Sequence, residues 1–346
     1  MKVYFPNGVE DLKEKTHDKR HETKDFLSEK GTRRKANRTK HPTTEIRNMT
    51  SNFQQQTFGI WHLTSLHPLK LLNFQTFKPS KNYLCRMAES IELKPGKKIY
   101  FASDFHLGAP DHERSLVRER IIVKWLDSIK SDAQVLFLMG DLFDFWFEYK
   151  SVVPKGFTRL LGKLAELSDE GVQLYIFPGN HDFWMMDYFT QELNAKIIHE
   201  PQEFLFNNQS FYIGHGDGLG PGDTSYKLLK KLLFANPVCQ WLFRYVLPPD
   251  VGQYLGNLWA RNSYKKNRKE DLTFEEIDIK EEFIYQYVME MESSDQKHDY
   301  YVFGHRHIAI NVKVNDTARY INLGDWIRFN SYAVFDGKKL ELVVQN

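Results

Sequence analysis

The chain has 346 residues, of which 41% are hydrophobic, so it can bury one large core or two ordinary ones. Two cysteines are too few for a disulfide framework or a cysteine zinc site, and no apolar run is long enough to span a membrane. The net charge of +2 conceals an asymmetry, because residues 1–86 hold 17 basic and 8 acidic side chains and leave an acidic remainder. Within that remainder, residues 226–270 hold nine basic and two acidic side chains, which suits an anionic ligand or a membrane surface.

Residues 1–96 are highly charged and show almost no apolar periodicity, so we expect a disordered basic extension there. Met87 directly precedes the first strand-like pattern. We hypothesise that Met87 is the true initiator and that residues 1–86 are a translated upstream region. Loss of activity on their deletion would contradict this. The N-terminus also lacks the apolar core of a secretory signal, so we expect a cytoplasmic location.

From residue 98 onward, strand-like runs alternate with helical patterns. Buried strands are expected at 98–103, 135–139, 172–178, 211–214 and 300–304, and amphipathic helices at 113–130 and 157–167. This alternation predicts an α/β architecture. Residues 226–292 interrupt it with a long, mostly helical insertion.

Polar residues and glycines follow each of five expected strands. In open α/β sheets, ligands bind outside the carboxyl ends of the strands, so we expect these residues to gather at one site. In chain order they are Asp104, His106, Asp141, Asn180, His181, His215, His305 and His307.

Imidazole mixed with carboxylate suits Mn²⁺, Fe²⁺ or Zn²⁺. The Asp-x-His and His-x-His spacings place two ligands on one face of an extended segment. Two ions about 3.5–4 Å apart can polarise a phosphoryl group and activate water. A lone histidine or Gly-Asp pair is more often structural, but five such elements after five strands jointly predict a dinuclear metal site.

The motifs DxH, GDxxD, GNHD, GHGD and GHxH, in this order, resemble the signature of calcineurin-like metallophosphoesterases over residues 98–326. The resemblance implies a four-layer α-β-β-α sandwich at 97–346, with a helical cap inserted at 222–292. It implies that His181 stabilises the transition state or protonates the leaving oxygen, and Asp144 could orient it. The implied ligands form two sets that share Asp141: Asp104, His106, Asp141 and His307 for one divalent ion, and Asp141, Asn180, His215 and His305 for the other.

The segments FASDFHLG, GDLFDFWFEY, GNHDFW, HGDGLGPGD and INLGDW resemble the UDP-2,3-diacylglucosamine hydrolases of lipid A biosynthesis. That resemblance implies cleavage of the substrate's pyrophosphate to UMP and 2,3-diacylglucosamine 1-phosphate, with two Mn²⁺ ions, at the inner face of the inner membrane. It implies a lipid-linked nucleotide as ligand, with neither nucleic acid nor an obligate protein partner. The family's RANSK-like substrate-binding stretch corresponds to Arg261, Asn262, Ser263 and Lys266.

The insertion mixes wide apolar faces with lysine and arginine, as do helices that bind anionic membranes. Its apolar residues are predicted to form an acyl-chain groove or to face a membrane; the alternative is that they only pack on one another. They are Leu228, Leu229, Leu232, Leu233, Phe234, Trp241, Leu242, Phe243, Tyr245 and Val246.

One departure keeps other functions open, because the best-known lipid A enzymes have arginine where this chain has His181. Arginine clamps phosphate, whereas histidine can also transfer a proton. The chain is therefore a variant with the same substrate, or it acts on another phosphodiester, nucleotide or phosphomonoester. A non-catalytic binding protein on this fold would show eroded ligands, and all seven are intact. Nuclease activity is suggested mainly by the basic N-terminal arm.

Overall fold

The computed structural model describes residues 88–221, 224–267, 278–294 and 296–345, with the side chains of residues 224, 225 and 260–267 outside the description. The fold below belongs to the compact unit Ser80–Asn346. Residues 1–87 of the expected disordered extension, with the proposed start at Met87, lie outside the described residues. Residues 88–96 are described, and the prediction of disorder is wrong there, because Glu89–Ile91 form a strand that pairs in a sheet.

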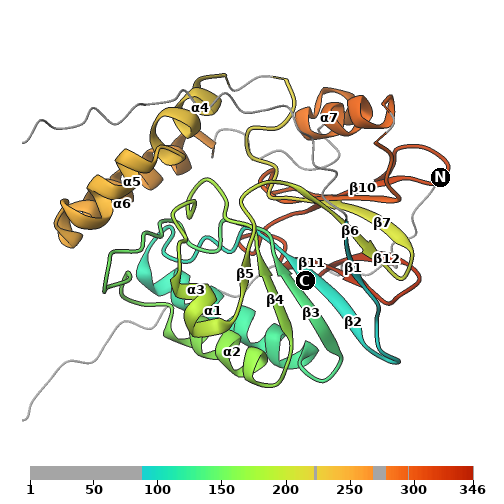
Figure 1. Cartoon of the computed structure of the whole chain (residues 1–346), viewed down its shortest axis with the longest axis horizontal. Helices are drawn as coiled ribbons and strands as arrows, with labels where there is room; N and C mark the ends of the chain where they lie inside the picture. The colour runs from blue at the N-terminus through green and yellow to red at the C-terminus, as the bar shows by residue number, and fades with distance from the viewer. Residues whose placement is uncertain (1–87, 222–223, 268–277, 295, 346) are drawn as a thin grey trace, which may run out of the picture. The chain divides into compact units, whose positions relative to one another are not determined.

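Two six-stranded sheets form the centre of this unit (Figure 1). In the first sheet, β2 to β5 run parallel and β11 and β12 extend it in antiparallel fashion. Its order is β12 (Leu340–Val344), β11 (Ser331–Phe335), β2 (Lys98–Ala102), β3 (Ala133–Leu138), β4 (Gln173–Ile176) and β5 (Lys196–Ile197). The order of the second is β1 (Glu89–Ile91), β6 (Gln202–Phe206), β7 (Gln209–Ile213), β8 (Tyr300–Phe303), β10 (Arg319–Leu323) and β9 (Ala309–Lys313).

Helices cover the outer face of each sheet. The helices α1 (His112–Ile129), α2 (Thr158–Asp169) and α3 (Tyr188–Leu193) pack on the first sheet, where Trp125 and Leu164 join a core with Leu136. The helix α7 (Phe283–Glu292) packs Ile284 and Val288 on the second sheet. The chain therefore forms the expected four-layer α-β-β-α sandwich (Figure 1).

The layer between the sheets is mainly aromatic. The rings of Phe101 and Phe137 stack with centroids 5.1 Å apart on the first sheet, and Phe211 of the second sheet stacks on Phe101 at 6.3 Å. Because the central strands are covered on both faces, they read as continuous apolar runs rather than as alternating patterns. The strands and helices predicted from residue 98 to residue 178 are confirmed within a few residues.

The predicted insertion contains several consecutive helices. The helix α4 (Thr224–Leu229) continues into a π-helical turn η1 (Lys230–Phe234), followed by α5 (Pro237–Tyr245), α6 (Pro249–Asn267) and a 3₁₀ turn η4 (Ile279–Glu281). The helices α4, α5 and α6 stand apart from those that cover the sheets (Figure 1). Phe234 and Phe243 anchor them to Phe147 and Trp184. Within the described chain, no helix has both the length and the apolarity needed to cross a membrane.

Candidate metal centre

The loops that leave neighbouring strands bring all seven expected ligands to one edge of the sandwich. Asp104 and His106 follow β2, Asp141 follows β3 and Asn180 follows β4. From the second sheet, His215 follows β7, and His305 and His307 follow β8. Since β2, β3 and β4 are parallel neighbours, and β7 and β8 are another parallel pair, their carboxyl ends meet at the same edge.

Five of the seven residues adopt a backbone conformation that side chains rarely accept. The φ angles are 57° for Asp104, 44° for His106, 53° for Asp141, 70° for His305 and 55° for His307. Left-handed conformations at non-glycine residues cost on the order of 1–3 kcal/mol each and persist where the surroundings enforce them. Such a concentration of strain favours a functional site.

Glycines allow the loops to approach the ligands closely. A Cβ atom on Gly140, whose φ is +88°, would overlap the imidazole of His215. A Cβ atom on Gly179 would overlap the carboxylate of Asp141. Only glycine fits at these two positions, because the ligand side chain fills the space of the missing Cβ.

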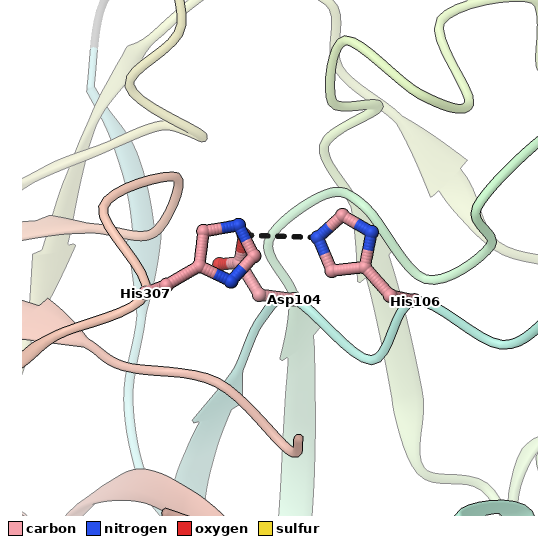
Figure 2. A group of neighbouring side chains, drawn as sticks. All are labelled: Asp104, His106 and His307. Atoms are coloured by element: carbon pink, nitrogen blue, oxygen red, sulfur yellow. Dashed lines mark ion pairs between the residues drawn. The ribbon is translucent and has the colours of Figure 1, made fainter. Parts of the chain in front are cut away.

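Asp104, His106 and His307 form the first group, and their side chains converge (Figure 2). Asp104 Oδ1 lies 3.7 Å from His106 Nε2 and 3.5 Å from His307 Nε2. The other oxygen, Oδ2, accepts hydrogen bonds from the His305 amide at 3.0 Å and from the Ser103 hydroxyl. One carboxylate oxygen is thus fixed by hydrogen bonds while the other faces two imidazoles.

Asp141 joins this group to a second one, which it forms with His215 and His305. Its Oδ1 accepts a hydrogen bond of 2.9 Å from the His181 amide. Its Oδ2 lies 3.4 Å from His215 Nε2 and 3.7 Å from His106 Nε2. Asp141 therefore occupies the position between the two groups that a bridging ligand requires.

Several polar atoms here are buried without a hydrogen-bond partner. They are Asp104 Oδ1, both ring nitrogens of His106, Asn180 Oδ1 and His215 Nε2. Buried polar atoms normally find partners, so a cluster of orphans indicates a ligand. Atoms bound at about 2.0–2.2 Å to one ion lie about 3–3.5 Å apart, near the measured 3.4–3.7 Å separations. The residues fit divalent ions.

The electrostatics of the site favour positive charge. Burial alone would raise the pKa of Asp141, but His215 and His181 outweigh it and hold that pKa well below its usual range. Burial lowers the pKa of His215, but the carboxylates of Asp141 and Asp104 raise it by more, so that it reaches about 10. The buried Asp141 carboxylate thus remains ionised at neutral pH and stabilises a cation beside it.

Three residues outside the expected set hold the ligands in place. His307 Nδ1 lies 3.3 Å from Asp325 Oδ2, and His215 Nδ1 lies 2.7 Å from the Met139 carbonyl oxygen. Arg118 donates to the carbonyl of His106 at 2.5 Å. The two contacts to ring nitrogens fix the orientation and tautomer of His307 and His215, and the Arg118 contact holds the backbone of His106. The sequence analysis missed Asp325, although the INLGDW segment that contains it carries part of the family resemblance.

His181 lies beside the two groups without belonging to the predicted ligands. Its Nδ1 is 2.9 Å from the main-chain oxygen of Asp144, whereas the Asp144 carboxylate is 3.6 Å away. The contact that orients the ring therefore comes from the Asp144 backbone. The same carboxylate lies 3.6 Å from His106 Nδ1.

The helix α6 reaches the site through Trp259, whose ring centroid lies 5.1 Å from that of His181. The sequence analysis did not single out Trp259. The expected substrate-binding residues Arg261, Asn262, Ser263 and Lys266 follow it on α6, but their side chains lie outside the described part of the chain.

Comparisons with known proteins identify relatives over most of the described chain. The profile of the family described as calcineurin-like phosphoesterase matches residues 97–309. A UDP-2,3-diacylglucosamine hydrolase of Porphyromonas gingivalis is 40% identical over 258 residues, which cover 71% of this chain and 96% of that protein. Proteins of the same name from Ectopseudomonas mendocina and Haemophilus influenzae are 28% and 26% identical, over 69% and 66% of this chain and 95% and 91% of their own lengths.

Proposed function

The chain belongs to the calcineurin-like phosphoesterase family, and we propose that it hydrolyses the pyrophosphate of UDP-2,3-diacylglucosamine in lipid A biosynthesis. The products would be UMP and 2,3-diacylglucosamine 1-phosphate. The observation that carries the proposal is the 40% identity to a hydrolase of that name along 96% of its length. The paired groups of carboxylate and imidazole support it as the site of hydrolysis.

We propose two divalent ions, Mn²⁺ in the cell, in the two ligand sets. One set is Asp104, His106, Asp141 and His307, and the other is Asp141, Asn180, His215 and His305. Divalent ions bound there would supply Lewis acidity to the phosphoryl oxygens and lower the pKa of water. The bridging role of Asp141 is supported by its Oδ2, which faces His106 on one side and His215 on the other.

His181 is proposed to act on the substrate itself. Hydrolysis adds the oxygen of water to one phosphorus and breaks the bridging P–O bond, so negative charge develops on the leaving oxygen. The Asp144 main-chain oxygen occupies Nδ1 and leaves Nε2 as the ring nitrogen for the substrate. Burial lowers the pKa of His181 and Asp141 partly opposes this, so the ring is neutral at pH 7 and has to take up a proton before it can protonate the leaving oxygen.

The cap helices α4, α5 and α6 are proposed to hold the lipid and to contact the inner face of the membrane. Leu228, Leu232, Trp241, Tyr245 and Val246 are each more than half exposed. Exposed apolar residues concentrated on neighbouring helices are unusual for a protein surface that meets only water. Lysine and arginine on the same helices add attraction to anionic lipid.

The stretch Arg261, Asn262, Ser263 and Lys266 is proposed to contact the substrate. The residues Asn262, Ser263 and Lys266 follow Trp259 at three, four and seven positions, the spacing of one helix face. Trp259 packs beside His181, which supports the proposal that this face of α6 contacts the substrate.

The second candidate function is the same chemistry on another phosphodiester, nucleotide or phosphomonoester, and His181 is the feature that favours it. One assay decides between the two: release of UMP from UDP-2,3-diacylglucosamine in detergent, compared with turnover of soluble phosphodiesters. We expect the lipid substrate to be preferred by at least about a hundredfold in kcat/KM. Preference for a soluble ester would replace the proposed function by the second candidate.

A further inference from the structure

A cavity opens beside the metal centre, and His215 is the one predicted site residue among the described residues that line it. Its volume is about 310 Å³, and His215, Gly216 and Asp217 form the wall toward the metal centre. Residues of α4 and η1 also line the cavity. Pockets for small ligands begin at about 300 Å³, so the cavity has room for one compact polar group but not for two acyl chains.

The segment formed by α4 and η1 has its lysines on the cavity and exposed leucines elsewhere on its surface. Lys227, Lys230 and Lys231 line the cavity, whereas Leu228 and Leu232 are 57% and 58% exposed. A nucleotide-linked lipid also has a polar end and an apolar end, joined by the pyrophosphate. A polar end in the cavity and acyl chains along the leucine side would leave the pyrophosphate near His215.

Two of the charged residues that line the cavity, Lys231 and Glu200, are not used in ion pairs within the described part of the chain. Lys230 Nζ is 2.9 Å from Asp217 Oδ2, and Lys227 Nζ donates to the Gly220 carbonyl at 2.5 Å. Among the described residues, neither Lys231 nor Glu200, which also lines the cavity, has an ion-pair partner.

The phenyl ring of Phe183 and the imidazole of His199 form part of the lining. The Phe183 and His199 rings meet edge to face with centroids 5.4 Å apart, and Lys230 Nζ lies 5.3 Å from the Phe183 centroid. Burial and then Lys230 lower the pKa of His199, so its ring is neutral at pH 7 and suits a neutral heterocycle. Stacking of a base on an aromatic ring contributes about 1–3 kcal/mol.

We propose that this cavity is the nucleoside subsite of the enzyme, in which Lys231 and Glu200 read the edge of uracil. Uracil presents two carbonyl acceptors on either side of one N–H donor. An ammonium group complements a carbonyl, and a carboxylate complements the N–H. Cytosine has an acceptor in place of the N–H and an amino donor in place of one carbonyl. The same lining therefore discriminates against cytosine. The inference rests on the proposed function for the choice of uridine among nucleosides.

The test is equilibrium binding of UMP, CMP and inorganic phosphate to the full-length, Mn²⁺-loaded protein by titration calorimetry. We expect UMP to bind at least about tenfold more tightly than CMP or inorganic phosphate. Lys231→Gln and Glu200→Gln should each weaken UMP binding roughly tenfold, the value of one charge-assisted hydrogen bond. Inorganic phosphate should bind both variants within twofold of the wild type.

Two exposed residues provide matched controls, Lys124→Gln on α1 and Glu290→Gln on α7, and neither should change UMP binding. UMP affinity that is unchanged in both cavity variants, or equal to that of CMP, would overturn the inference. The binding measurement also distinguishes failure of the proposed subsite from failure of the proposed function. If UDP-2,3-diacylglucosamine is not cleaved but UMP binds as described, the proposed function fails and the subsite stands. If the lipid is cleaved and the variants bind UMP normally, the subsite fails alone.

Discussion

At the scale of single residues, the ligands are defined by what surrounds them as much as by their own chemistry. The motifs are sufficient to predict Asp104, His106 and the other five candidate ligands, because each follows a strand directly in the sequence. Arg118 could not be found that way, because it reaches the ligands from the helix α1. Asp325 follows β10 after Gly324, as the ligands follow their strands, but no strand was expected at 319–323.

The contact between Asp325 and His307 yields the first prediction. Asp325→Asn keeps the shape of the side chain but removes the charge that faces His307 Nδ1 at 3.3 Å. Loss of such a contact typically weakens metal binding by about 10–100-fold. Mn²⁺ titration should show this loss, whereas Asp169→Asn, an exposed change at the end of α2, should leave the affinity unaltered. Equal affinities of wild type and Asp325→Asn would contradict the supporting role.

His181 yields the second prediction, which separates chemistry from metal binding. His181→Gln should lower kcat by roughly 10²–10⁴-fold, the usual contribution of an acid–base group. The metal content of the purified variant should not change, because His181 is outside both proposed ligand sets. His181→Arg tests the alternative that phosphate clamping is sufficient. If metal content falls together with activity in His181→Gln, His181 is a ligand and the proposed role is wrong.

At the scale of elements, the alternation of short apolar runs with amphipathic helical patterns predicts the α/β class. The four-layer sandwich was expected from the resemblance to the metallophosphoesterases. The packing of each helix was harder to predict. The helix α7 falls inside the predicted insertion but packs on the second sheet through Ile284 and Val288. An apolar stripe on a helix indicates that the helix packs on another element, but it does not identify that element.

The exposed face of the cap yields the third prediction. Leu232 and Trp241 are 58% and 55% exposed. The double change Leu232→Ser and Trp241→Ser should weaken binding to vesicles with phosphatidylglycerol by at least about tenfold, since each buried apolar side chain contributes about 1.5–3 kcal/mol. Sedimentation with vesicles measures this. Val117→Ser on α1, which removes an equally exposed residue away from the cap, is the control. Unchanged sedimentation of the double variant would remove the membrane contact from the proposal.

At the scale of the whole molecule, a dependence of stability on pH follows from buried histidine outside the metal centre. Burial lowers the pKa of His298 below 6.5, and its ring stacks on Tyr212 at 5.3 Å. His298 of the unfolded chain takes up a proton at about pH 6.5, whereas His298 of the folded chain does so only at lower pH. The free energy of unfolding therefore falls as the pH drops below about 6.5. His298 therefore contributes most above pH 6.5.

The fourth prediction compares denaturant unfolding of wild type and His298→Gln between pH 7.5 and pH 5.5, with chelator present so that metal binding adds no pH dependence. The free energy of unfolding should decrease more steeply toward low pH in the wild type than in His298→Gln. The variant should be less stable at pH 7.5, because it also loses the ring contact with Tyr212. Parallel pH profiles of the two proteins would exclude His298 as a source of the dependence.

The most direct test of the central claim is UMP release from UDP-2,3-diacylglucosamine by the purified chain, with Mn²⁺, in parallel with Asp141→Asn. Asp141 is shared by both proposed ligand sets, so its loss should reduce bound metal and lower the rate by about a thousandfold or more. The account predicts stoichiometric UMP and 2,3-diacylglucosamine 1-phosphate from the wild type and almost none from Asp141→Asn. Absence of UMP from the metal-loaded wild type, or equal rates for the two proteins, would contradict it.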